Sequence, residues 1–280
     1  MVNQTYQKKT GQRYTEEPQG NLERFYGNKY LIPLFLFLFF IWSVIGTDFN
    51  PKTLVEGFPN ILDFVGCMYP PEFDAFSNLV KPAIETIQMA FLGTLFATLI
   101  SFPLAILAAK NLTTSRLLRN TSKGLIAFTR TVPDIVFALI FVSAVGLGTF
   151  PGTLALSCHS IGMLGKLYGE AIEEIDPQPL EAVEAVGASR IQSIKYAVIP
   201  QILPSFVANT FYRFDVNVRA SVVLGLVGAG GIGFELIYAM KLFSYREVAS
   251  ILIVIFIIII LSEKVSDVIR KRIIGEEVLK

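Results

Sequence analysis

The chain has 280 residues, of which 52% are hydrophobic and only 17% charged, and its mean hydropathy is +0.55. Soluble proteins of this size carry about 25% charged residues, so the composition indicates a single domain that crosses a membrane several times. The net charge of +1 excludes the strongly basic balance that nucleic-acid-binding proteins use. The two cysteines, Cys67 and Cys158, and the single histidine show no metal-binding spacing.

The N-terminal part begins with a polar segment, residues 1–29, which we expect to be a cytoplasmic tail. The first apolar run follows at residues 30–46. A cleaved signal peptide is the alternative, but the polar leader is long and no small-residue cleavage site follows, so we favour a retained span. Residues 47–80 form an acidic connection, in which apolar residues such as Ile61 and Phe64 predict a helix lying on the membrane.

Apolar segments farther along the chain predict the other membrane helices of an all-α permease domain, residues 30–272. A basic loop at residues 110–123 and a charged tail at residues 273–280 complete the layout. The apolar segments are residues 82–109, 124–148, 151–172, 205–227 and 247–260. Together with the first run at residues 30–46, they make six spans.

The distribution of lysine and arginine predicts the orientation of these spans. An even number of spans places both termini on one side, and most of the 24 cationic residues fall on that side. Because cytoplasmic loops carry the excess of Lys and Arg, both termini are expected in the cytoplasm. The opposite face holds only Lys52, Lys81, Lys241 and Arg246.

A polar stretch, residues 176–204, interrupts the apolar segments. Pro177 and Pro179 suit the first turn of a helix, where a missing N–H matters little, and predict a short helix over residues 180–186. Gly187 is a natural left-handed stop. A second short helix is expected over residues 188–198, ended by Pro200 and Pro204. Two short helices joined at a glycine between spans would make a compact docking surface for a partner protein.

The same stretch carries a family resemblance. Glu181-Ala182, Gly187 and Ile199-Pro200 resemble the E-A-A, Gly, I-x-L-P pattern of ABC-importer permeases, with apolar replacements at Val183, Ala197 and Ile199. In that family the stretch is the cytoplasmic coupling helix that docks into the ATPase. The words ALIFVSAVGLG, HSIGMLGKL, DPQPLEAVEAVGASR and VLGLVGAGGIG are similar to phosphonate-importer permeases, over roughly residues 79–272.

The resemblance implies a type I ABC importer with a methionine-importer-like permease fold in a bacterial inner membrane. Its expected partners are the lipid bilayer, a second copy of the chain, two cytoplasmic ATPase subunits and an extracytoplasmic phosphonate-binding protein. ATP and Mg would be held by the ATPases, so no cofactor is expected in this chain. The residues expected to couple to the ATPase are Glu181, Ala182, Glu184, Gly187, Ala188 and Pro200.

Two glycine-containing words look like nucleotide sites but lack the required context. Residues 228–233, GAGGIG, are formally G-x-G-x-x-G, yet no βαβ unit surrounds them. We expect a tight, non-helical turn that lets backbones approach closely. Gly165-Lys166-Leu167 lacks the hydroxyl residue and first glycine of a P-loop, and we expect Lys166 to pair with Glu170, four residues on.

The fifth span carries an unusual set of polar residues. At spacings of four, Asn209, Arg213, Asn217 and Ser221 form one slowly drifting stripe, which we expect to face water or substrate. Asp215 and Arg219 are expected to form an ion pair or a gate on the opposite side. The alternative for the whole set is a role in holding helices together.

No catalytic constellation is visible. His159 has no second base beside it, and is expected either to bond between helices or to line the pathway. The sequence thus predicts a transport subunit that is not an enzyme, importing phosphonates or related oxyanions such as phosphite, hypophosphite or a phosphate ester. The alternatives are an ion-coupled secondary transporter or a permease for another small solute. A membrane enzyme and a scaffold are weaker rivals, because the first needs a nucleophile and the second needs no charges inside a span.

Overall fold

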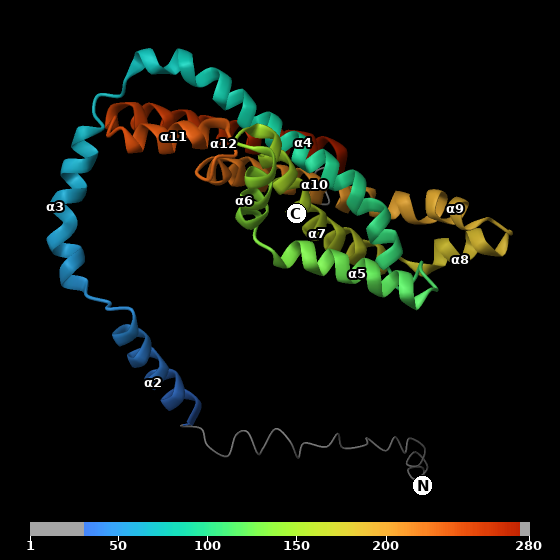
Figure 1. The fold of residues 1–280 in the computed structure, drawn as a ribbon. Helices are drawn as coiled ribbons and strands as arrows, with labels where there is room; N and C mark the ends of the chain where they lie inside the picture. The colour runs from blue at the N-terminus through green and yellow to red at the C-terminus, as the bar shows by residue number, and fades with distance from the viewer. Residues whose placement is uncertain (1–30, 275–280) are drawn as a thin grey trace, which may run out of the picture. The chain divides into compact units, whose positions relative to one another are not determined.

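The structure, a computed structural model, describes residues 31–274 (Figure 1), and both predicted polar tails lie outside this range apart from Ile273 and Ile274. Every regular element in this range is helical. The chain divides into two compact units, one ending at Leu62 and one beginning at Asp63, which are described separately.

The first unit contains α2, Leu31–Gly46, and most of α3, Pro51–Cys67. None of the residues of α2 is buried, although nearly all are apolar. An apolar helix with no protein core to pack against is suited to lipid, as predicted for residues 30–46. α3 coincides with the helix expected within the acidic connection, and its apolar residues are likewise exposed.

The second unit is a helical bundle around α7, Thr149–Glu173, and α10, Ile199–Gly225. α7 contacts α4, α5, α6 and α10, while α10 also packs on α11 and α12. After the short η2 helix, Phe73–Ala75, the remaining helices of this unit are α4 Phe76–Ala108, α5 Arg116–Thr131, α6 Asp134–Val145, α8 Pro177–Ala185, α9 Arg190–Ser193, η3 Ile194–Val198, α11 Gly231–Lys241 and α12 Tyr245–Ile274.

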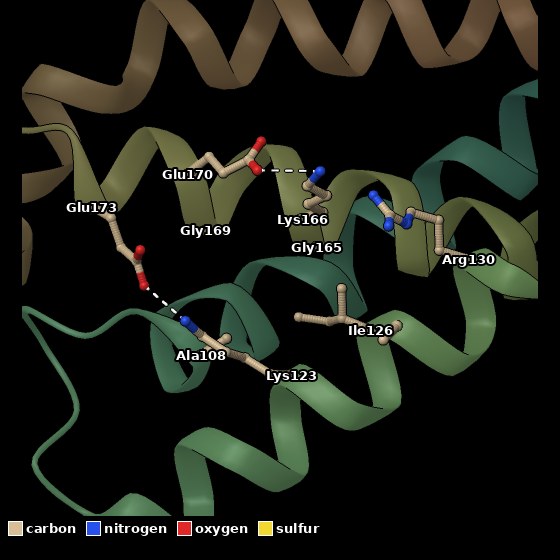
Figure 2. Close-up of a pocket in the computed structure, with 10 residues that line it drawn as sticks. Ala108, Lys123, Ile126, Arg130, Gly165, Lys166, Gly169, Glu170 and Glu173 are labelled. Atoms are coloured by element: carbon tan, nitrogen blue, oxygen red, sulfur yellow. Dashed lines mark hydrogen bonds and ion pairs between the residues drawn. The ribbon is translucent and has the colours of Figure 1, made fainter. Parts of the chain in front are cut away.

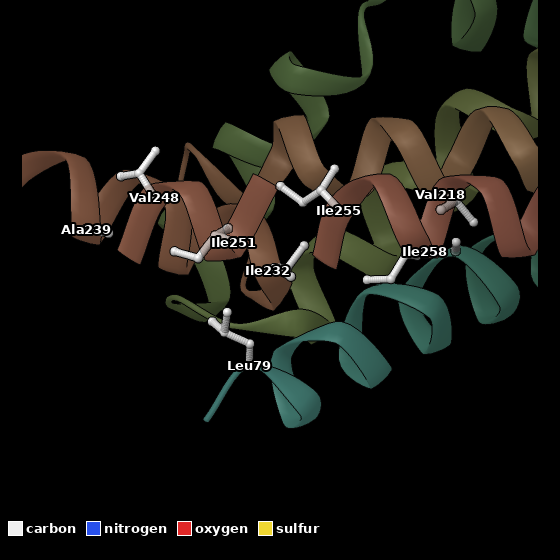
Figure 3. Close-up of a cluster of buried hydrophobic side chains, with 9 residues drawn as sticks. Leu79, Val218, Ile232, Ala239, Val248, Ile251, Ile255 and Ile258 are labelled. Carbon is white, nitrogen blue, oxygen red and sulfur yellow. The ribbon is translucent and has the colours of Figure 1, made fainter. Parts of the chain in front are cut away.

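Three apolar clusters hold this bundle together. One joins α4, α10, α11 and α12, where Leu79, Val218, Ile232 and Ile251 are all at most 2% exposed (Figure 3). A second surrounds Tyr168 on α7, whose ring stacks on another aromatic ring of α10 at 4.2 Å between centroids. The third joins α6, α7 and the end of α10. α7 and α10 are thus fixed to each other on either side of the polar residues between them.

The span predicted over residues 124–148 is not one continuous helix, and whether it crosses the membrane stays a prediction. α5 ends at Thr131, α6 begins at Asp134, and the two helices are bent by 86° at the break. Val132 is extended, with φ −75° and ψ 121°, because a residue before proline is pushed out of the helical region. α5 also begins at Arg116, so more than half of the predicted basic loop is helical.

The expectation that Pro200 and Pro204 end the second short helix is also wrong. α9, the π-helical turn η3 and α10 follow one another without a break, and Pro204 lies inside α10. In the π turn the Ile199 N–H bonds to the carbonyl of Ile194, five residues back. Pro200 then occupies the first turn of α10, where a missing N–H is tolerated.

Within the described residues, two helical stretches, Phe73–Ala108 and Tyr245–Ile273, are long and apolar enough to cross a membrane. The number rises to four if the bent pairs α2 with α3 and α5 with α6 each count as one span. α7 and α10, with 25 and 27 residues, are about 38 and 40 Å long, but they are more polar because they face other helices. The six-span arrangement stays a prediction.

Candidate functional site

The polar residues of α10 are turned into the bundle. Arg213 is 4% exposed, Ser221 1% and Asn217 fully buried, while Asn209 is half-buried and donates to Ser205 Oγ on its own helix. In this structure the stripe therefore lies between helices, whereas the sequence analysis favoured a surface open to water or substrate. Spacing alone defines a face of α10 but not what covers it.

A directed chain of hydrogen bonds joins three helices. Arg213 Nε donates to Ser160 Oγ on α7 at 2.8 Å, and Ser160 Oγ donates to Asn217 Oδ1 at 3.1 Å. Asn217 Nδ2 then donates to Thr94 Oγ1 on α4 at 2.8 Å, and that hydroxyl donates to the Ala90 carbonyl at 2.7 Å. Each hydroxyl accepts one bond and donates the next, so all four side chains are fixed in orientation. We call Arg213, Ser160, Asn217 and Thr94 the Arg213 network.

Most of the N–H groups of the Arg213 guanidinium have no hydrogen-bond partner among the described residues. A guanidinium has five N–H groups, and only Nε has a hydrogen-bond partner among the described residues. No carboxylate in residues 31–274 lies within 4.0 Å of it, although Asp134 is near enough to act on its charge. A buried cation without an ion-pair partner is unfavourable. Such a site favours an anion whose oxygens match the planar fork.

Two members of the network, Ser160 and Thr94, were missed as functional residues by sequence reasoning. Ser160 stands beside His159 in the word HSIGMLGKL, but nothing in that word gives it a role, and Thr94 is one of several hydroxyl residues in an apolar helix. Only the packing of α4 and α7 on α10 identifies them.

His159 makes the interhelical contact that was one of its two expected roles. Its Nδ1 lies 3.0 Å from the carbonyl oxygen of Val132, in the break between α5 and α6. One turn on, Gly162 touches the last turn of α5 just before the break, since a Cβ there would come within 2.3 Å of Arg130 N. α7 therefore holds the break from two positions, close to where it meets Arg213.

Asp215 and Arg219 do not form the expected ion pair. Asp215 is buried and accepts a 2.7 Å hydrogen bond from Ser266 Oγ on α12. Arg219 is exposed, and the structure shows no ion pair between it and a described carboxylate. Although the two are four residues apart, the nearby hydroxyl of α12 satisfies Asp215, and Arg219 extends outward.

Residues 176–204, the coupling segment, have the helix–glycine–helix form expected. Asp176 caps α8 by accepting from Gln178 N at 3.0 Å, and Gly187 follows with φ +83°. Of the residues expected to couple, Ala188 is half-buried and the others are exposed: Glu181, Ala182, Glu184, Gly187 and Pro200. Val186 and Ile191 add apolar side chains that are 84% and 79% exposed. The segment thus offers an accessible surface with both charged and apolar groups.

Hydrogen bonds within the coupling segment hold its first part on the start of α10, and one bond ties the segment to the connection after α4. Gln201 on α10 accepts from Asp176 N at 2.9 Å and donates to the Ala197 carbonyl at 2.8 Å. The Arg190 guanidinium donates to the carbonyl of Leu112, in the connection before α5. Movement of the segment would therefore be transmitted to both α10 and the end of α4.

The first half of the glycine-rich word forms the tight turn predicted for it, but residues 231–233 are the first turn of α11 and not a non-helical turn. Gly228, Gly230 and Gly231 all have positive φ, and Gly148 N donates to the Gly228 carbonyl at 3.0 Å. A Cβ at Gly233 would come within 1.9 Å of the Val222 carbonyl oxygen, so only glycine allows α11 to fold back on α10.

The part of the chain that the structure describes holds no group of three His, Cys, Asp or Glu side chains able to bind a metal. The expected Lys166–Glu170 pair is confirmed at 3.3 Å.

Comparisons with known proteins agree with this architecture. The phosphite transport system permease protein PtxC of Stutzerimonas stutzeri is 42% identical over 222 residues, covering 79% of this chain and 81% of that one. The phosphate-import permease protein PhnE of Mycolicibacterium smegmatis is 44% identical over 230 residues, covering 82% of this chain and 43% of that longer protein.

Among solved structures, a chain of the MetNI methionine ABC transporter in an inward-facing conformation matches with a TM-score of 0.63. It is 21% identical, and the match covers 72% of this chain and 98% of that chain. This likeness confirms the predicted all-α, methionine-importer-like fold.

Residues 101–274, more than half of the chain, match the family described as binding-protein-dependent transport system inner membrane component. The match includes the coupling segment, α7 and α10 with their three network residues, and the last turns of α4 beyond Thr94. The chain therefore belongs to this family of membrane transport components, which are not enzymes.

Proposed function

We propose that this chain is the permease subunit of an ATP-driven importer and forms the membrane pathway for phosphonates or related phosphorus oxyanions. The observation that carries the proposal is Arg213, a buried arginine whose fork has no carboxylate partner among the described residues. The relatives named for phosphite transport and phosphate import support the same class of cargo.

The chemistry of the cargo fits the site. A phosphonate carries one to two negative charges near neutral pH, and its tetrahedral oxygens can accept two N–H bonds from one guanidinium. In a low-dielectric bundle, a fixed cation offsets part of the lost hydration of the anion. The second N–H groups of the Asn209 and Asn217 amides would assist along the helix, whereas Ser221 Oγ already donates to the Val218 carbonyl. Since a tight site would hold the cargo, binding must remain weak.

We propose that two copies of the chain form one pathway on a two-fold axis in a bacterial inner membrane. Each copy would cross the membrane six times, with both termini in the cytoplasm. An extracytoplasmic binding protein would deliver the cargo, and two cytoplasmic ATPases would hold ATP and Mg. The ATPases would dock on the coupling segment through Glu181, Glu184 and Gly187, with Ala182, Ala188 and Pro200 completing the surface.

In this mechanism the chain performs no chemistry. Closure of the ATPases on ATP would pull the coupling segment, and the bonds from Gln201 and Arg190 would transmit the movement to α10 and α4. Because Arg213 and Ser160 join α10 to α7, movement of α10 would change the access to the guanidinium. Release of the ATP products would return the pathway to the inward-facing state.

The proposal is tested with the assembled complex in proteoliposomes that contain its ATPase and binding protein. Labelled methylphosphonate and phosphite are supplied outside, with or without ATP inside. The expected result is ATP-dependent accumulation of at least one of the two anions. Accumulation driven equally well by an ion gradient without ATP, or selective uptake of a cation or neutral solute, would contradict it.

A further inference from the structure

A second cation-rich site lies between α5 and α7, on the coupling-segment side of Arg213. It is a groove of about 260 Å³, and Figure 2 shows its lining side chains. Lys123 and Arg130 come from α5, and Lys166, Glu170 and Glu173 from α7. We call this the α5–α7 groove.

Glycines on α7 create the groove. At Gly165 a Cβ would lie 2.9 Å from Ile126 Cγ1, so the two helices approach closely there. Gly169, one turn on, has nothing within 4 Å of an added Cβ, and the space that a side chain would fill is the groove itself. Ala108, Ile126 and Ala127 also line the groove, so it combines an apolar surface with charged side chains.

The charges in the groove favour an anion. Its lining has three cations against two carboxylates. Lys123 pairs with Glu173 at 3.1 Å, and Lys166 pairs with Glu170 at 3.3 Å (Figure 2). Arg130 has no ion pair or side-chain hydrogen bond with any residue in the range 31–274, and Figure 2 shows its guanidinium at the Lys166 end of the groove.

The groove lies farther along the axis of α7 than Arg213, toward the coupling segment. Arg213 meets α7 at Ser160, and Lys166 is six residues farther along α7, which is about 9 Å toward the coupling segment. Glu173 ends α7, and Asp176 begins the coupling segment directly afterwards. An anion that left Arg213 toward the cytoplasm along α7 would reach Arg130 and Lys166 before Lys123.

We propose that the α5–α7 groove is a second binding site for the phosphorus oxyanion, used on the cytoplasmic side of Arg213; this rests on the function proposed above. Arg130 binds the oxygens of the anion, and Lys166 turns to them from Glu170. The apolar lining accepts the organic substituent of a phosphonate. Glu170 and Glu173 then compete for the two lysines and so promote release.

Lys166 can change partners because its ion pair with Glu170 is exposed. The side chains of Lys166 and Glu170 are 46% and 52% exposed, and such pairs contribute little to stability. The groove therefore has enough positive charge to attract the anion, and its binding of the anion is weak enough to allow release.

The test uses the full complex in proteoliposomes and measures methylphosphonate uptake beside ATPase activity stimulated by the binding protein. Arg130→Gln combined with Lys166→Gln is expected to reduce uptake about tenfold, with stimulated ATPase activity retained. Arg130→Lys combined with native Lys166 should restore most of the uptake, because the charge is retained. Full uptake by the double variant would overturn the proposal.

Gly169→Leu tests the groove without changing any charge. The added side chain should enter the groove and reduce uptake of methylphosphonate, while the complex assembles normally. The matched controls lie on α5 outside the groove: Gly124→Leu, where an added Cβ also has nothing within 4 Å, and Arg116→Gln. Both should retain uptake, and equal losses in Gly124→Leu and Gly169→Leu would contradict a specific role for the groove.

The two proposals fail in different ways. If the native complex accumulates neither methylphosphonate nor phosphite, the proposed function is wrong. If the native complex accumulates them and Arg213→Gln does not, but the double variant and Gly169→Leu both do, only the groove assignment is wrong.

Discussion

Arg213 on α10 and Ser160 on α7 are joined by a 2.8 Å hydrogen bond, and this bond aims a buried guanidinium. Ser160 is fully buried, and its own proton is directed to Asn217 Oδ1. The Ser160 hydroxyl therefore fixes the orientation of both Arg213 and Asn217.

Ser160→Ala should disturb both neighbours. Loss of the hydroxyl leaves the Arg213 Nε–H and Asn217 Oδ1 without their partner, which costs about 1–3 kcal/mol for each buried polar group. The expected results are a lower unfolding temperature of the purified complex and reduced uptake. The control is Ser157→Ala, because Ser157 Oγ bonds only to the carbonyl of Thr153 on its own helix. Equal stability of the two variants would contradict the network.

Gly187→Val should detach the ATPase. The glycine has φ +83°, a region that β-branched residues strongly avoid, although nothing lies within 4 Å of an added Cβ. The effect would therefore come from backbone strain rather than from a clash. Co-purification of the ATPase measures the loss. Gly187→Asn is the control, because asparagine tolerates the left-handed region better; normal docking by the valine variant would refute the assignment of the coupling segment.

Glu173 should make stability depend on acidic pH. Burial raises its pKa, but bonds from the Lys123 side chain and the Lys110 N–H, with the charges of both lysines, outweigh burial, and the net pKa is lowered. A carboxylate with a lowered folded-state pKa adds stability above its unfolded pKa, about 4.3, and this is lost as pH falls through the folded pKa. The unfolding temperature of the native complex should fall over this range, and that of Glu173→Gln should fall less. If the unfolding temperatures of the two complexes depended on pH in the same way, the lowered pKa of Glu173 would be contradicted.

The membrane topology is tested by labelling single cysteines in intact cells with an impermeant reagent. Cys67 and Cys158 are first replaced, and cysteines are then introduced at Asp63, Gln192 or Lys280. We expect labelling from outside at position 63 only, because the cationic residues favour cytoplasmic termini and a cytoplasmic coupling segment. Labelling at position 192 from outside would overturn the orientation.

Sequence predicted the elements that depend on local chemistry. The apolar runs of α4 and α12 and the helix–glycine–helix form of the coupling segment are of this kind. So is the glycine turn after α10, because positive φ at three glycines requires nothing beyond the chain itself. These features can be predicted from the sequence because the conformation of each depends on only a few neighbouring residues.

The break between α5 and α6 could not be predicted in the same way. Pro133 ends α5, whereas Pro82 and Pro103 lie inside α4, which continues through both. The difference is tertiary, since α7 holds the extended backbone through His159 and the close approach of Gly162. A proline in an apolar segment allows a break, but other helices stabilise it.

The candidate site was predicted in part. The spacing of four identified the face of α10 that carries Arg213 and Asn217, yet it could not show that Ser160 and Thr94 cover that face. The same spacing suggested an Asp215–Arg219 ion pair. Instead, Asp215 accepts a hydrogen bond from Ser266 on α12, 51 residues farther along the chain. Contacts between distant helices decide which side chains meet.

The most direct test of the account compares Arg213→Gln with Arg219→Gln in proteoliposomes, with labelled methylphosphonate uptake measured beside complex yield. Both variants lose one positive charge from α10, but Arg213 is buried in the network and Arg219 is exposed. We predict that Arg213→Gln loses at least about 90% of uptake, equivalent to about 1.4 kcal/mol or more, at normal yield and ATPase activity, while Arg219→Gln retains uptake. Full uptake by Arg213→Gln at normal yield would contradict the central claim that this arginine carries the oxyanion through the membrane.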